Sequence, residues 1–256
     1  MTIAGDAILF ITGASSGIGA ATARLLSVPG RTIHLQGRDE ARLAALVTEV
    51  TAAGATAVPH CIALHGIASH CIAWHGIAWH RMELDDAAAV DAAAINLASS
   101  ISSLDLLVHS AGMVTLSSVE SADITELDRQ YAVNLRAPFS LTTALTPALV
   151  AARGQVVFVN SGAGQRSSPG WSQYAATKFG LRALADAFRA EVAERGVRVT
   201  TVFPGRTATP MQQKVHRFEG REYHADSFMG PEQVASTIMH AVELPRSATI
   251  PEISIR

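Results

Sequence analysis

Apolar and polar positions succeed one another along the chain in a way that predicts alternating strands and helices. Short apolar runs predict strands over residues 7–12, 32–36, 56–59, 104–108, 155–160, 197–203 and 250–255. Longer segments with helical periodicity predict helices over residues 20–26, 40–52, 86–99, 124–151 and 173–194. Strands and helices therefore follow one another along most of the chain.

This alternation indicates the class of fold. Strands joined by helices through short connections favour a parallel sheet with right-handed crossovers and helices on both faces. We therefore expect residues 1–256 to form a single α/β domain built on a doubly wound parallel sheet, the Rossmann fold. In this architecture ligands bind beyond the carboxyl ends of the strands.

One segment interrupts the alternation. Residues 60–80 contain a tandem five-residue repeat in which every unit begins with His. Without residues 61–80 the chain would run directly from Pro59-His60 to Arg81, so we interpret 61–80 as an insertion into a complete fold, and we expect its deletion to leave the catalytic residues in place. Its Ile and Trp residues are too apolar for a solvated loop, which favours packing on its own subunit or on a neighbour.

The histidines of the insertion raise the hypothesis of a metal site. A spacing of five residues alternates between the faces of a strand and rotates each His by about 140° around a helix, so neither element gathers all five. Only a folded hairpin would cluster some of them with Cys61 and Cys71. We therefore expect no metal, and a tolerated sequence expansion is the simpler interpretation.

Composition and charge exclude several classes of protein. Apolar residues make up 48% of the chain, the formal net charge is −2, and Lys and Arg are scattered, so neither nucleic acid nor an anionic membrane is an expected partner. No apolar stretch is long enough to span a bilayer. Only two cysteines occur, Cys61 and Cys71, which favours a reducing, cytoplasmic location.

A glycine-rich turn follows the first predicted strand. The segment Thr12-Gly13-Ala14-Ser15-Ser16-Gly17-Ile18-Gly19 lies between a strand and a helix. Missing Cβ atoms would let a pyrophosphate approach the backbone at the helix N-terminus, although a merely tight turn is the alternative. The turn predicts dinucleotide contacts at Gly13, Ser15, Ser16, Gly17, Ile18 and Gly19.

The residue after the second predicted strand indicates which dinucleotide is bound. A carboxylate is expected there when a protein hydrogen-bonds the ribose hydroxyls of NAD, but the sequence has Gln36-Gly37-Arg38. The Arg38 guanidinium suits a 2′-phosphate through paired, charge-assisted hydrogen bonds. NADP (NADPH) is therefore the expected cofactor, the alternative being an exposed arginine at a helix start.

Tyr174 and Lys178 are the strongest catalytic candidates. They lie four residues apart on a predicted helix and hence on one face. An ordinary phenol has a pKa of about 10, so proton transfer near neutral pH requires a nearby positive charge and a hydroxyl donor. Ser161, at the carboxyl edge of the fifth predicted strand, can supply that hydroxyl.

Together these residues resemble the short-chain dehydrogenase/reductase family over nearly the whole chain. The resemblance rests on the glycine motif at 12–19, Ser161, the Tyr-x-x-x-Lys pair Tyr174 and Lys178, and Asn134 in Val133-Asn134-Leu135. It implies that Tyr174 is the general acid or base, that Ser161 orients the carbonyl, that Lys178 holds the ribose and lowers the phenol pKa, and that Asn134 anchors a proton-relay water.

The resemblance implies further cofactor contacts and shows departures. The turn Pro204-Gly205 with Thr207 and Thr209 would contact the nicotinamide end. The small residues Ala111 and Gly112 remain where the cofactor passes, but His109-Ser110 replace the family's two asparagines, which predicts weaker hydrogen bonding between strands. Glu83, next to Leu84, stands where the family has an adenine-reading aspartate.

The favoured hypothesis is an NADP(H)-dependent oxidoreductase that transfers a hydride between nicotinamide and a small or medium carbonyl or secondary alcohol. The alternative is a non-catalytic dinucleotide-binding sensor or scaffold whose insertion recruits a metal or partner. The substrate would contact residues 162–172 and 211–229, where Phe218, Tyr223 and Phe228 form either a lid or core. The resemblance also implies a homotetramer or dimer assembled through helices 124–151 and 173–194.

Overall fold

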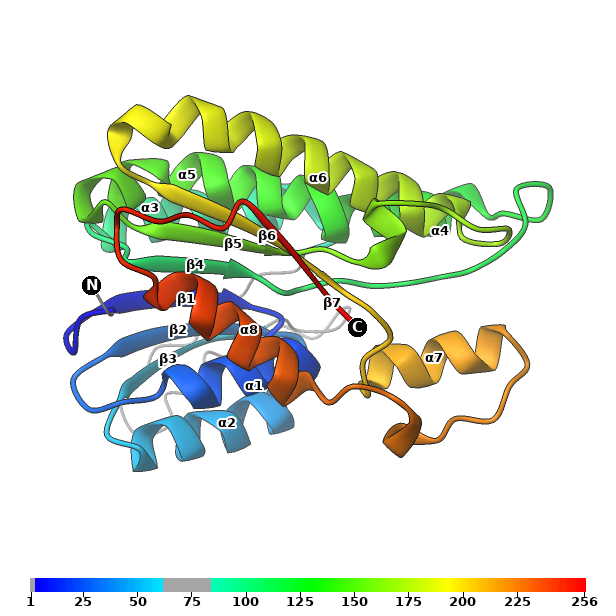
Figure 1. The fold of residues 1–256 in the computed structure, drawn as a ribbon, viewed down its shortest axis with the longest axis horizontal. Coiled ribbons are helices and arrows are strands. Elements are labelled where there is room, and N and C mark those ends of the chain that lie inside the picture. Colours follow the sequence, from blue (N-terminus) through cyan, green and yellow to red (C-terminus); the bar gives the residue numbers. More distant parts are fainter. Residues whose placement is uncertain (1–2, 62–83) are drawn as a thin grey trace.

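The computed structural model describes residues 3–61 and 84–256, which form one seven-stranded parallel sheet (Figure 1). The strand order is β3-β2-β1-β4-β5-β6-β7. The strands are β1 (Ile8–Thr12), β2 (Thr32–Gly37), β3 (Thr56–Cys61), β4 (Leu106–His109), β5 (Gln155–Val159), β6 (Arg198–Pro204) and β7 (Glu252–Ile255). The doubly wound α/β fold expected from the sequence is confirmed.

Helices cover both faces of the sheet, and each face has its own apolar core. One face carries α1 (Gly17–Leu26), α2 (Glu40–Ala52) and α8 (Pro231–Glu243), and the other carries α3 (Ala87–Ser100), α5 (Ala137–Ala152) and α6 (Ser172–Val192) (Figure 1). Neighbouring residues of β1 point to opposite sides, so Leu9 and Ile11 enter the first core and Phe10 enters the second. The central strands β1, β4 and β5 are buried on both faces and are therefore mainly apolar, with polar residues only at their ends.

The strand order creates a crevice at the centre of the sheet. From β1 the chain proceeds to β2 and β3 on one side, and it then crosses back to place β4 on the other side of β1. The connections that follow β1 and β4 therefore lead to helices on opposite faces of the sheet, and this architecture binds ligands beyond the carboxyl edge at such a point. Gly13 follows β1 at this point, and Ser110 follows β4.

The predicted strands and helices are present with bounds shifted by a few residues, and three features differ. The predicted helix 124–151 is divided into α4 (Ile124–Tyr131), a π-helical turn (Ala132–Arg136) and α5. Two helices were not predicted, α7 (Pro210–Phe218) and α8. Both begin with a proline at the first helical position, where the missing N–H costs nothing.

Several sequence predictions fall on residues 62–83, which lie outside the described part of the chain. These residues hold most of the five-residue repeats, together with Glu83. Within residues 3–61 and 84–256, no group of three or more His, Cys, Asp or Glu side chains is arranged to hold a metal ion. Over the same residues, none of the helices combines the length and apolar character needed to cross a membrane.

Candidate functional site

The turn after β1 is held in a conformation that requires glycine. Gly13 has φ of 69°, and a Cβ built there would lie 2.7 Å from the backbone of Ala111. A Cβ on Gly19 would overlap the Gly13 carbonyl oxygen. Gln36 supports the turn from β2, since its Oε1 accepts from Gly13 N at 3.1 Å and its carbonyl oxygen accepts from Ala14 N at 2.8 Å. Sequence reasoning assigned no role to Gln36.

Helix α1 begins immediately after this turn without a side-chain cap. Ser16 is the N-cap residue, and its side chain makes no capping hydrogen bond. The first backbone N–H groups of the helix therefore lack the usual hydroxyl partner, which suits an anionic ligand. Ser15 packs close to the backbone of Gly37, where a Cβ would lie 2.8 Å from the Ser15 Cβ. The side chain of Ile18 is half-buried against the first core.

The loop after β4 is tied to β1 by Thr12. The Thr12 Oγ1 accepts from Ser110 N and Ala111 N, each at 3.1 Å. Thr12 Oγ1 therefore holds the backbone of this loop against β1. The weaker hydrogen bonding expected from the missing asparagines stays a prediction. The His109 side chain, which stands in place of an asparagine, is buried. Its ring centre lies 5.0 Å from that of Phe158, and its Nε2 lies 2.9 Å from Thr142 Oγ1.

Arg38 is exposed just beyond β2, where the sequence predicted a phosphate contact. Its neighbour Asp39 caps α2 and pairs with Arg42 at 3.1 Å, and no carboxylate pairs with Arg38 among the described residues. Burial lowers the pKa of Lys214 on α7. The negative charge of Glu126 raises this pKa, and the positive charge of Arg38 lowers it. Lys214 therefore adds to the positive potential around Arg38, a contribution that the sequence did not reveal.

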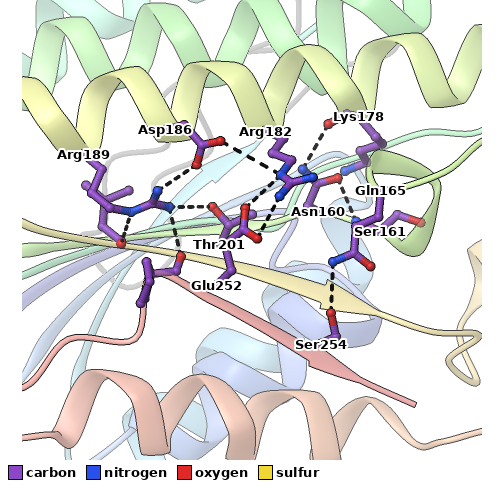
Figure 2. A network of polar contacts seen from close by, with 12 residues as sticks. Asn160, Ser161, Gln165, Lys178, Arg182, Asp186, Arg189, Thr201, Glu252 and Ser254 are labelled. Atoms are coloured by element: carbon purple, nitrogen blue, oxygen red, sulfur yellow. Dashed lines mark hydrogen bonds and ion pairs between the residues drawn. The ribbon is translucent and has the colours of Figure 1, made fainter.

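Ser161, Tyr174 and Lys178 meet at the carboxyl edge of β5. Ser161 caps a 3₁₀ turn (Gly162–Gly164), and its Oγ accepts from Ala163 N at 3.1 Å. Tyr174 and Lys178 are buried on α6, with Lys178 Nζ 5.8 Å from the centre of the Tyr174 ring. The same Nζ donates to the Val159 carbonyl oxygen at 3.1 Å. Figure 2 shows how Ser161 and Lys178 approach from the strand end and the helix.

Burial governs the protonation of both side chains on α6. It raises the pKa of Tyr174 to about 12, while a hydrogen bond with the Ser161 side chain acts in the opposite direction. Burial lowers the pKa of Lys178 to about 8. Tyr174 thus carries its proton at neutral pH, the state that a proton donor requires. A lowering of the Tyr174 pKa by Lys178 stays a prediction.

Asn134 lies in the π-helical turn and reaches the loop after β4. The side chain is fully buried, its Oδ1 accepts from Met113 N at 2.8 Å, and its Nδ2 donates to Met113 O and Thr177 Oγ1 at 2.9 and 3.0 Å. A Cβ on Gly112 would lie 3.4 Å from Asn134 Oδ1 and 3.8 Å from Lys178 Nζ. Gly112 therefore marks the point where Asn134 and Lys178 converge. π-helical turns are frequent at functional sites.

The turn after β6 lies across the crevice from the glycine turn. Thr209 caps α7, and its methyl group would be 3.0 Å from a Cβ on Gly17. Thr207 is buried and donates to the Gly205 carbonyl oxygen at 3.1 Å. Pro204 ends β6.

Leu84, the first described residue after residues 62–83, is buried in the second core.

Tyr174 belongs to a small apolar cluster separate from the two cores of the sheet. Trp171 meets the Tyr174 ring edge-on, with ring centres 6.0 Å apart. The cluster consists of Val114, Tyr174 and Val215, with Leu116, Ala163, Trp171 and Met211 packed against it. Tyr223 and Phe228 are partly buried against the ring of His216, whereas Phe218 is 42% exposed. Trp171 and Met211 lie within the ranges 162–172 and 211–229 that the sequence predicted for substrate contact, but no periodic signal singled them out within those ranges.

Known proteins resemble this chain over most of its length. The family model for short chain dehydrogenases matches residues 7–220. Glycine betaine reductase ATRR of Emericella nidulans is 28% identical over 97% of this chain, which spans only 18% of that protein. A metagenomic short-chain oxidoreductase in complex with NADP is 27% identical with a TM-score of 0.76, covering 100% and 98% of the two chains. A short chain dehydrogenase from Burkholderia cenocepacia in complex with NADP is 25% identical with a TM-score of 0.78, at the same coverage.

The match of the family model covers far more than half of the chain. The chain therefore belongs to the short-chain dehydrogenase/reductase family, and it is an oxidoreductase of that family.

Proposed function

We propose that this protein is an NADP(H)-dependent oxidoreductase that interconverts a small or medium carbonyl compound and the corresponding secondary alcohol. The observation that carries the proposal is the buried Tyr174, which lies with Ser161 and Lys178 beside the crevice at the centre of the sheet. No observation on the described residues favours the non-catalytic alternative.

The residues at the crevice fit a nicotinamide dinucleotide. Gly13 lets the turn pack directly against the backbone of Ala111, where a Cβ would overlap, and the uncapped start of α1 suits the pyrophosphate. Arg38 would hold the 2′-phosphate of NADP, which is bound in two similar structures. Ala111, Gly112, Thr207 and Thr209 would line the path to the nicotinamide end, where the bound cofactor supplies or accepts the hydride. Leu84, and Glu83 among the residues not described, would lie on the adenine side.

Tyr174 would move the proton. In carbonyl reduction its phenol donates the proton to the carbonyl oxygen, and Ser161 holds that oxygen by a hydrogen bond. Lys178 would hold the ribose and stabilise the phenolate that remains, because a positive charge favours the ionised form. Asn134 would keep the loop after β4 in place and anchor the relay water that returns a proton from solvent.

The surroundings of Tyr174 support an apolar substrate. Val114 and Val215 form an apolar cluster with Tyr174, and Trp171 and Met211 pack against that cluster. A small or medium ketone, aldehyde or secondary alcohol without a charged group would lose little hydration on entering this cluster. Val114, Trp171 and Met211 would then determine the size of substrate accepted.

Replacement of Tyr174 by Phe tests the proposal. The change removes the transferable proton and little binding surface, so Tyr174→Phe should reduce turnover by at least about 100-fold while NADPH still binds. The assay is NADPH absorbance with a panel of aldehydes, ketones and secondary alcohols, with NADH in parallel, and cofactor binding is followed by fluorescence. Wild-type turnover in the variant would refute the proton-transfer role of Tyr174, and a wild-type protein inactive with every compound and both cofactors would refute the enzyme hypothesis.

The proposed function includes one domain, assembly of subunits and a cytoplasmic location. Residues 1–256 would form one Rossmann-type oxidoreductase domain, with 61–80 as an insertion that contributes no catalytic residue. The subunits would assemble into a dimer or homotetramer through the surface of α4, α5 and α6. The low cysteine content supports a cytoplasmic location.

A further inference from the structure

Asn160 connects the two chain segments that carry the catalytic side chains. It follows β5 directly, it is 5% exposed, and its side chain turns toward α6 (Figure 2). The Asn160 Nδ2 donates to the Lys178 carbonyl oxygen at 3.0 Å, and its Oδ1 accepts from Ser161 N at 2.8 Å. One buried amide therefore contacts the backbone of both Ser161 and Lys178.

A backbone hydrogen bond and a close contact with Gly164 hold the side-chain amide of Asn160 in place. The backbone N–H of Asn160 donates to the Val202 carbonyl oxygen of β6 at 2.8 Å, which continues the sheet ladder past the end of β5. Gly164 lies directly over the amide, since a Cβ there would overlap Asn160 Oδ1 and lie 2.9 Å from the Lys178 carbonyl oxygen. Sheet and turn thus leave the side chain one orientation, in which both hydrogen bonds form.

A second contact fixes the other end of Lys178. Its Nζ donates to the carbonyl oxygen of Val159, the residue before Asn160. Lys178 is therefore tied to the end of β5 through both its ammonium group and its backbone. Further along α6, Arg182 makes a two-point ion pair with Glu252 of β7 at 2.8 and 3.0 Å (Figure 2).

We propose that Asn160 is a positioning residue that sets the distance between the Ser161 hydroxyl and the Tyr174–Lys178 pair. The inference rests on the proposed function, because it concerns the proton transfer assigned to Tyr174. Asn160 itself touches neither substrate nor cofactor in this scheme. Its effect is geometric, and a misplacement of about 1 Å can lower a rate by about 100-fold.

Two substitutions separate positioning from general stability. Asn160→Leu removes both hydrogen bonds. Asn160→Asp is nearly isosteric, retains the acceptor for Ser161 N, and replaces the donor to the Lys178 carbonyl with a carboxyl oxygen. Gln155→Leu is the matched control, because Gln155 is a buried amide at the other end of the same strand, with hydrogen bonds to Val242 O and Arg198.

The measurements are kcat for carbonyl reduction between pH 5 and 8, and the thermal midpoint of each variant. We expect Asn160→Leu to lower kcat by about 100-fold at every pH, whereas Gln155→Leu loses stability but keeps kcat within about threefold. Asn160→Asp should be impaired at pH 8 and recover roughly tenfold relative to wild type at pH 5. The reason is that a protonated carboxyl can donate to the Lys178 carbonyl, whereas an ionised carboxylate repels it.

The outcomes distinguish this inference from the proposed function. If Asn160→Asp retains wild-type kcat at pH 8, or shows no recovery at pH 5, the positioning role is wrong. If Asn160→Leu does not fold, the nearly isosteric Asp variant decides the question. An active Tyr174→Phe would instead refute the proposed function, whereas an inactive Tyr174→Phe with unaffected Asn160 variants would refute only the inference.

Discussion

His109 is a basic side chain placed where its charged form is strongly disfavoured. Burial lowers its pKa to about 3, and its Nδ1 has no hydrogen-bond partner among the described residues. Nε2 contacts Thr142 Oγ1 at 2.9 Å. The folded protein therefore holds His109 neutral, whereas the unfolded chain titrates it at about 6.5.

This difference predicts a loss of stability in acid. Between pH 6.5 and 3 the unfolded state binds the extra proton, so the free energy of unfolding should decrease as the pH falls and be restored above about 6.5. From pH 6.5 to 5 the loss from this one group is about 2 kcal/mol. His109→Gln keeps a donor toward Thr142 and removes the titration. Urea unfolding of both proteins at pH 5 and 7 measures the difference, and an equal pH dependence would contradict it.

The proposed function makes Arg38 the residue that selects NADPH over NADH. Arg38→Ala should weaken NADPH binding by about tenfold or more, since charge-assisted hydrogen bonds to a phosphate are lost, and should change NADH binding by less than about threefold. Arg195→Ala, an exposed arginine at the end of the 3₁₀ turn that follows α6, is the control. Fluorescence titration with both cofactors measures the effect, and an equal loss for NADPH and NADH would remove the assignment.

At the scale of elements, the close contact between β1 and α1 depends on Gly19. A Cβ on Gly19 would overlap the Gly13 carbonyl oxygen, which is backbone and cannot move independently. We expect Gly19→Ala to lower the free energy of unfolding by about 1–3 kcal/mol and to weaken NADPH binding by roughly tenfold. Gly5→Ala, where no atom lies within 4 Å of the added Cβ, is the control. Urea unfolding and fluorescence titration follow the two effects, and unchanged values would contradict the steric argument.

Elements with strong apolar periodicity were predictable from the sequence. Elements whose conformation depends on tertiary contacts with other segments were not. The strands and most helices match their predicted ranges because each buries a continuous apolar face. The π-helical turn at Ala132–Arg136 has no periodic signal. The sequence of α7 is short and mostly polar, and its Met211 and Val215 pack in the cluster around Tyr174. Tyr174, Lys178 and Ser161 were predictable from spacing, whereas Gln36, Asn160 and Lys214 act through contacts with residues distant in sequence.

At the scale of the whole molecule, exposed apolar side chains gather on the face where we propose that subunits meet. The surface over α3, α4, α5 and α6 has a depression of about 930 Å³, with Ile95, Tyr131 and Phe139 between 50% and 68% exposed. Large apolar side chains grouped in this way favour a protein interface. The residues expected for subunit contact, in helices 124–151 and 173–194, lie in this region.

Phe139→Glu tests assembly through this face. A charge buried at the centre of an apolar interface is costly, so the variant should shift the protein from an oligomer toward monomer. Val119→Glu changes a side chain that is 77% exposed and lies outside the depression, so it should leave the molar mass unchanged. Light scattering coupled to size-exclusion chromatography gives the mass. A Phe139→Glu variant of unaltered mass would exclude this face.

The order of apolar and polar residues by itself determined the parallel α/β architecture, the glycine turn and the types of side chain available for proton transfer. These properties depend on local periodicity and on spacing within single elements, and both can be read from the amino-acid sequence. Only the tertiary structure decided the burial that raises the Tyr174 pKa and lowers the His109 pKa, and the contacts by which Thr12, Gln36 and Asn160 hold the crevice. Desolvation and hydrogen bonding between distant segments exist only once the strands have assembled.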